Sequence, residues 1–213
     1  MSMLALGQFV LWVNAASPHQ TVAQFVAAAK AGEMRVGGTG SKQEDELVTS
    51  AMARAAGGRF SYVPLRGGAE VAQALVEQRV DATVNNPSEA VADWTSGKLR
   101  PLCVFHNARL EATAKVTDTQ AWSDIPTCKE AGLNVEYSML RGVLLPAGVT
   151  AEQRAFYEEL FKRVRATPGW KETLENGVFN PTTLSGEAFA RWLATEEGRH
   201  RDWMRAAGFL PKQ

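Results

Sequence analysis

The chain has 213 residues, of which 45% are hydrophobic and 22% are charged. This is the usual composition of a soluble globular protein and leaves ample length for a buried core. The 23 basic and 23 acidic residues balance, which excludes the basic surface of a nucleic-acid-binding protein. No apolar run approaches the roughly 20 residues of a membrane-spanning helix. Residues 1–7 are too short for a signal peptide and carry no basic side chain, so a leader either was never present or has been left out.

Short apolar runs alternate with amphipathic stretches over the first half of the chain, which predicts strands that alternate with helices. The expected strands are residues 9–13, 35–37, 60–65, 80–84 and 99–105, and the expected helices are 21–31, 44–56, 71–77 and 89–95. A strand–loop–helix unit repeats three times within this region. Such an alternation predicts an α/β fold with parallel strand pairing and right-handed crossovers.

The second half of the chain is predicted to be mostly helical. A polar surface stretch, a short helix and a strand come first, at residues 107–123, 126–131 and 135–140. Thr150 then opens a capping box, Pro168 stands at the first position of a second helix, and residues 185–207 form a third. The change in composition divides the chain into an α/β region, 12–138, and a mostly helical region, 139–213.

Three strand-to-helix loops are rich in glycine and small polar residues, and each precedes a predicted helix. In a parallel sheet such loops share the edge at the carboxyl ends of the strands. Unpaired backbone N–H groups and the positive end of the helix dipole favour an anion there. The candidate ligand-binding residues of these loops are Gly38, Thr39, Gly40, Ser41, Lys42, Gln43, Arg66, Gly67, Gly68, Asn85 and Asn86.

Other kinds of site find little support. The glycines also have a structural interpretation as turn residues, although three such loops on one edge favour binding. The first loop is neither a Walker A motif nor GxGxxG, because residue 43 is Gln. No GxSxG is present, and Cys103 and His106 fall on opposite faces of a strand. Two cysteines and scattered histidines do not make a metal site. We therefore expect no catalytic residue, no metal and no cofactor.

Seven segments of the chain follow the order of a known family. They are FVLWVNAASP (9–18), VGGTGSKQED (36–45), YVPLRGG (62–68), VDATVNNP (80–87), SGKLRPL (96–102), DIPTCKEAG (124–132) and LPAG (145–148). Together they resemble the receptors of tripartite tricarboxylate transporters, often called Bug-type receptors. The resemblance implies a type II periplasmic-binding-protein fold, in which two α/β lobes close on a small carboxylate, and a periplasmic location.

The resemblance also implies roles for particular residues. The loop 38–43 would bind a ligand carboxylate through backbone N–H groups and hydroxyls, residues 67–68 and 85–86 would belong to the second and third pocket loops, and the strand near 139–142 would border the cleft. Arg141 stands where many members carry an aromatic residue. It either pairs with the distal carboxylate of a diacid or is solvated at the rim.

The resemblance further implies that the N-terminal portion of the family lies outside this sequence. The chain would then hold a complete second lobe and only the helical C-terminal part of the first lobe. We expect such a chain to bind carboxylates weakly, with melting shifts below about 2 °C at millimolar dicarboxylate. We also expect it to self-associate through exposed apolar surface.

The expected function is therefore a non-catalytic receptor that binds a small organic carboxylate or dicarboxylate for membrane transporter subunits. The alternatives are a thiol- or serine-dependent enzyme on the same fold, using Cys103 or a loop serine, and a ligand-sensing component of a signalling system. The periplasmic setting would permit a disulfide between Cys103 and Cys128, but buried free cysteines are equally ordinary. We favour two free thiols.

Overall fold

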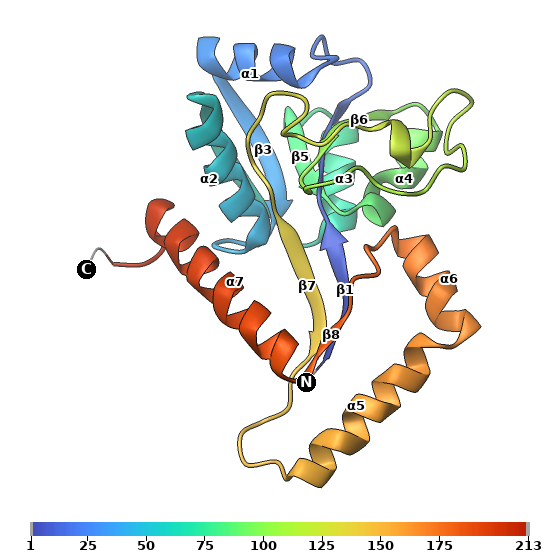
Figure 1. The fold of residues 1–213 in the computed structure, drawn as a ribbon. Helices are drawn as coiled ribbons and strands as arrows, with labels where there is room; N and C mark the ends of the chain where they lie inside the picture. Colours follow the sequence, from blue (N-terminus) through green and yellow to red (C-terminus); the bar gives the residue numbers. More distant parts are fainter. Residues whose placement is uncertain (1, 212–213) are drawn as a thin grey trace. The chain divides into compact units, whose positions relative to one another are not determined.

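The computed structural model describes residues 2–211, which form two compact units (Figure 1). Within the described residues, unit 1 comprises residues 2–7 and 139–211, and unit 2 comprises residues 8–138. No helix within residues 2–211 is long and apolar enough to cross a membrane. The three glycine-rich loops all belong to unit 2.

Unit 2 is built on a five-stranded sheet with the order β4-β3-β5-β2-β6. Its strands are β2 (Val10–Asn14), β3 (Glu33–Thr39), β4 (Arg59–Leu65), β5 (Ala82–Asn85) and β6 (Leu99–Val104). Strand β3 pairs in parallel with β4 and β5, as predicted, whereas β2 runs antiparallel to β5 and β6. The prediction of parallel pairing throughout is therefore wrong for β2. The alternating pattern determines direction only for strands joined by a crossover helix, and β2 pairs with strands far along the chain.

The helices of unit 2 flank this sheet in two pairs. They are α1 (Val22–Ala31), α2 (Glu44–Ala56), α3 (Gly68–Val76) and α4 (Pro87–Thr95). Helix α1 packs with α2 against β3 and β4, while α3 packs with α4 and against β5. Because β4 and β5 lie on opposite sides of β3, right-handed crossovers place α2 and α3 on opposite faces of the sheet. The chain thus leaves β3 and β5, which are neighbours, toward opposite faces.

The core of unit 2 is centred on β2, which is buried on both faces. Val10, Leu11, Trp12 and Val13 are fully buried, which explains why this strand is a continuous apolar run rather than an alternating one. The rings of Trp94 and Trp122 pack on Trp12 with centroids 6.1 and 6.0 Å from it, and on each other at 4.7 Å.

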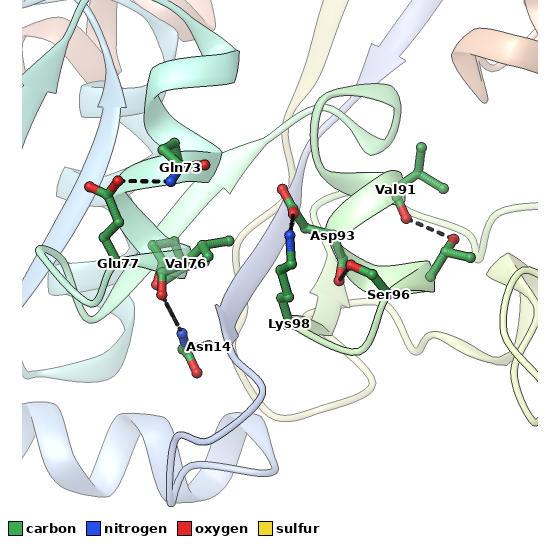
Figure 2. A network of polar contacts seen from close by, with 10 residues as sticks. Asn14, Gln73, Val76, Glu77, Val91, Asp93, Ser96 and Lys98 are labelled. Atoms are coloured by element: carbon green, nitrogen blue, oxygen red, sulfur yellow. Dashed lines mark hydrogen bonds and ion pairs between the residues drawn. The ribbon is translucent and has the colours of Figure 1, made fainter.

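The end of β2 is fastened to the carboxyl end of α3. Asn14 Nδ2 donates to the carbonyl oxygens of Leu75 and Val76, both at 3.1 Å (Figure 2). Near the end of α4, Lys98 Nζ lies 3.4 Å from Asp93 Oδ1 (Figure 2). Since β2 runs antiparallel to β5, these contacts lie at the edge of the sheet opposite to the three glycine-rich loops and stabilise that edge.

A disulfide joins Cys103 in β6 to Cys128, with the Cα atoms 4.8 Å apart. The prediction of two free thiols is therefore wrong. The short helix predicted at residues 126–131 is also wrong, since these residues form no helix. The backbone of residues 126–128 pairs with β6 instead: Val104 N donates to Pro126 O and Cys128 N donates to Val104 O, each at 2.9 Å. This pairing brings the two cysteines side by side.

Unit 1 contains a small sheet of order β7-β1-β8 and three helices. Its elements are β1 (Ser2–Gln8), β7 (Ser138–Val143), α5 (Ala151–Arg165), α6 (Pro168–Gly177), β8 (Leu184–Ser185) and α7 (Gly186–Ala206). The three helices confirm the helical prediction, whereas β1 was not predicted. Met3 and Leu6 of β1 pack with Phe189 of α7. Helix α5, described over its whole length, has no buried residue, and Phe156 on it is 58% exposed.

Candidate functional site

The three loops lie at one edge of the unit 2 sheet. Strands β3, β4 and β5 run in the same direction, and they end at Thr39, Leu65 and Asn85, just before α2, α3 and α4 begin. The edge between β3 and β5 is where the chain turns to opposite faces of the sheet. Ligands of open α/β sheets bind at such a switch point, outside the carboxyl ends of the strands.

Residues of β4 hold the backbone of the first loop in its conformation. Gly40 and Lys42 both have left-handed backbone angles, with φ of 64° and 57°, which glycine adopts freely and lysine does not. Tyr62 Oη donates to the carbonyl oxygens of Thr39 and Gly40 at 3.1 and 2.9 Å. Gly40 N donates to Leu65 O at 2.8 Å. The loop is therefore shaped by the protein itself.

Each loop already has a backbone N–H group bonded to a carboxylate of the helix that follows it. These pairs are Thr39 N with Asp45 Oδ2 (2.6 Å), Lys42 N with Glu46 Oε2 (2.5 Å), Arg66 N with Glu70 Oε2 (3.1 Å) and Asn86 N with Glu89 Oε2 (2.8 Å). The prediction that the backbone N–H groups of these loops bind a ligand does not include these internal partners. The signal was present, because the three glutamates each occupy the third position of a helix, where a capping box places Glu.

Glu89 connects the third loop to the second. The Asn85 amide, in a residue only 1% exposed, donates from Nδ2 to Gly68 O and to Glu89 Oε2, both at 3.2 Å. A Cβ built on Gly68 would clash with the Glu89 carboxylate. A side chain at position 68 would therefore displace the carboxylate at the end of the flexible Glu89 side chain from its present position.

Asp45 is the buried acid of the site, with 7% of its surface exposed. Burial raises the pKa of Asp45 to about 7; the charges of Glu89 and Glu44 add to the increase, and the N–H of Thr39 opposes it. Burial and the nearby charge of Asp45 also raise the pKa of Tyr62. The edge thus holds a carboxyl group that titrates near neutral pH.

The remaining predicted side chains differ in what surrounds them. Ser41, Lys42 and Gln43 are exposed. Arg66 is exposed as well, and its Nε lies 3.2 Å from Glu70 Oε2, so that its charge is partly matched within the chain. The candidate residues of unit 2 are thus brought to one edge, but acidic side chains accompany the donors there.

Arg141 belongs to unit 1, on β7. Its guanidinium carbon lies 5.5 Å from the centre of the Phe179 ring, and its Nε is buried with no hydrogen-bond partner among the described residues. Stacking on an aromatic ring is a common setting for arginine. Its pairing with a ligand carboxylate stays a prediction.

No catalytic pair forms around Cys103, because its sulfur is held in the disulfide. His106 Nδ1 lies 2.9 Å from Ser138 Oγ, and burial lowers the pKa of His106. Within residues 2–211 no group of three His, Cys, Asp or Glu side chains is arranged to hold a metal ion. The thiol enzyme alternative thereby loses its nucleophile.

Known proteins share both the sequence pattern and the fold. The family model of the tripartite tricarboxylate transporter family receptor matches residues 1–209. A curated Cupriavidus necator protein, described as a UPF0065 protein in the gbd 5′ region, is 28% identical over 193 residues, which cover 90% of this chain and 56% of the relative. The chain thus spans little more than half the length of this curated relative.

Solved structures of the same type cover nearly all of this chain. A TctC solute-binding protein from Polaromonas, without ligand, is 24% identical with a TM-score of 0.76, over 98% of this chain and 68% of its own. A protein of R. palustris solved with adipate is 23% identical with a TM-score of 0.81, over 97% and 67%. MatC from Rhodopseudomonas palustris, with bound malate, is 19% identical with a TM-score of 0.76, over 97% and 68%.

These likenesses confirm the predicted α/β fold of the type II periplasmic-binding-protein kind, which was reached from the order of the seven segments. At these identities the solved structures establish the fold alone, whereas the family model, which matches residues 1–209, establishes membership. The chain belongs to the receptor family of the tripartite tricarboxylate transporters.

Proposed function

We propose that this chain is part of a periplasmic solute receptor that binds a small organic carboxylate and passes it to membrane transporter subunits, without catalysis of its own. The three loops of unit 2 would supply the carboxylate site, through backbone N–H groups and the Thr39 and Ser41 hydroxyls. Family membership supports the receptor role. The relatives solved with adipate and malate support a carboxylate ligand.

The observation that carries the proposal is a pair of uncapped helix N-termini at the loop edge. The N-cap residues of α2 and α3 are Gln43 and Gly67, and neither makes a side-chain cap bond. By contrast, Thr21, Thr150 and Thr167 cap α1, α5 and α6 with their hydroxyls, whereas Ser185, the N-cap residue of α7 in unit 1, makes no side-chain cap bond either. The first N–H groups of a helix have no intrahelical partner. Those of α2 and α3 are thus left for an anion, whose charge the helix dipole also favours.

An amide-resolved titration tests this proposal. Succinate, adipate and malate would each be added to the ¹⁵N-labelled chain, and the backbone amide shifts would be followed by NMR. Saturable shifts are expected at the residues that begin α2 and α3, 44–46 and 68–70, because their N–H groups would meet the carboxylate. Shifts are also expected at the loop residues 38–43, which would surround it. The amides that begin α1 and α5 are internal controls, since their helices are capped. If no acid produces saturable shifts in the loops, the proposed function is wrong.

A pair of matched variants localises the site. Ser41→Ala removes an exposed loop hydroxyl and is expected to weaken binding severalfold, as the loss of one hydrogen bond does. Ser96→Ala removes the hydroxyl that donates to Asp93 O at the opposite edge of the sheet and should leave the affinity unchanged. Equal affinities for the two variants would remove the first loop from the site.

A further inference from the structure

One carboxylate oxygen of Glu89 is free to accept a hydrogen bond at the edge of the sheet where we propose that the ligand binds. The residue is exposed, and its Oε2 accepts hydrogen bonds from the Asn86 N–H and from Asn85 Nδ2. Its Oε1 lies against Gly68, at the first turn of α3, and accepts no hydrogen bond from any described residue. One carboxylate oxygen thus holds the loops together while the other faces an uncapped helix N-terminus.

A second acceptor lies beside Glu89. Both groups near Asn85 Nδ2, the Gly68 carbonyl and the Glu89 carboxylate, are acceptors, so the orientation of this amide follows from its surroundings. The Asn85 Oδ1 atom is then buried without a hydrogen-bond partner among the described residues. An unpaired buried acceptor is costly, and a donor from a ligand would relieve that cost.

Above about pH 7, where the carboxyl group of Asp45 is ionised, Asp45 adds to the negative charge of this edge. The Glu89 charge contributes to the raised pKa of Asp45, which places the two carboxyl groups within electrostatic reach of each other. A ligand carboxylate at the α2 and α3 N-termini would therefore meet like charge as well as N–H donors. Repulsion of this kind penalises a plain carboxylate. A donor group on the ligand, next to its carboxylate, would replace the repulsion by a charge-assisted hydrogen bond.

We propose that Glu89 makes this edge select carboxylates that carry a hydroxyl or ammonium group on the carbon next to the carboxylate. The selection rests on the proposed function, because it presumes that the three loops bind a carboxylate. Glu89 acts in it as a specificity-determining residue: Oε1 accepts the hydrogen bond from the ligand, and Oε2 keeps its place on the Asn86 N–H.

Three acids with one carbon skeleton test the selection. Succinate, malate and aspartate are four-carbon diacids that differ only in carrying hydrogen, hydroxyl or ammonium at one carbon. The wild-type chain is expected to bind malate and aspartate roughly tenfold more tightly than succinate, which corresponds to about 1.4 kcal/mol. The dissociation constants would be measured by the same NMR titration, at one pH and one ionic strength.

Glu89→Gln is the decisive variant. Glutamine still accepts from the Asn86 N–H, as capping boxes with Gln do, but it has no negative charge. The tenfold preference for aspartate should collapse, and succinate should bind as tightly as before or severalfold more tightly. Glu77→Gln is the matched control: it makes the same substitution at the far end of α3, where Glu77 accepts from Gln73 at 2.7 Å (Figure 2), and should keep the wild-type preference.

The outcomes separate this inference from the function on which it rests. If none of the three acids binds the wild-type chain, the proposed function fails and the selection fails with it. If the acids bind with equal affinity, or if the preference survives Glu89→Gln, the carboxylate site stands and the selection is wrong. If the preference is lost in Glu89→Gln alone, Glu89 is the selecting residue.

Discussion

The buried carboxyl group of Asp45 makes the stability of unit 2 depend on pH in an unusual direction. Its pKa is about 7 in the folded chain, against an ordinary value of 3.8. Between these two values the folded state holds a proton that the unfolded state has lost. The free energy of unfolding therefore falls as pH rises through this range. Below about pH 4 the penalty is absent, and above about pH 7 it is complete.

The size of the effect follows from the shift in pKa. A change of one pKa unit corresponds to 1.36 kcal/mol, so a rise from 3.8 to about 7 amounts to about 4 kcal/mol. Asp45→Asn removes the titrating group but keeps an oxygen that can accept from the Thr39 N–H. Relative to the wild-type chain, the variant is expected to gain about 4 kcal/mol of stability between about pH 4 and about pH 8.

Urea denaturation of both chains across this pH range measures the difference directly. The pH dependence of all other groups is common to the two chains and cancels in the difference. Asp118→Asn is the matched control, because Asp118 is exposed on the surface stretch before Trp122, and its difference from the wild-type chain should stay flat. A flat difference for Asp45→Asn as well would refute the reasoning, since Asp45 would then be charged in the fold without penalty.

Two further predictions concern the scaffold of the site. Replacing Cys103 and Cys128 by serine removes the disulfide and should cost about 3 kcal/mol. Thermal melts should then fall by roughly 6–12 °C, and an unchanged melting temperature would contradict this. Gly38→Ala places a Cβ 2.5 Å from the Asp45 Cβ and should cost about 1–3 kcal/mol in urea denaturation. Gly198→Ala, with open space around it, is its control, and equal losses for the two would show that the first loop yields easily.

Much of unit 2 could be predicted because local signals and tertiary structure agree there. The bounds predicted for α2 match the structure, since its apolar positions have helical spacing and Gly57 ends it in the left-handed conformation. The strand order needed more than local signals. β2 lies between β5 and β6, and nothing within the segment that forms it indicates an antiparallel direction.

The errors at Cys103 and at residues 126–131 have one cause. Pro126 and the residues after it suggest a helix start, but the backbone of this segment pairs with β6. Strand pairing over more than twenty residues of sequence cannot be derived from spacing alone. The same pairing brings Cys128 to Cys103, a proximity that the composition and spacing of the two cysteines do not reveal.

In the three loops, the residues that predict helix capping lie next to the residues that predict ligand binding. Glu46, Glu70 and Glu89 each bond a backbone N–H of the loop before their own helix, which fixes the loops without a ligand and lowers the ordering cost of binding. The first N–H groups of α2 and α3 remain uncapped by any side chain of their N-cap residues. An arriving carboxylate would therefore meet donors already in place and negative charge beside them. The affinity of a ligand for this edge therefore depends on the group that it places beside the protein carboxylates. The geometry favours a hydrogen-bond donor on the carbon next to the ligand carboxylate.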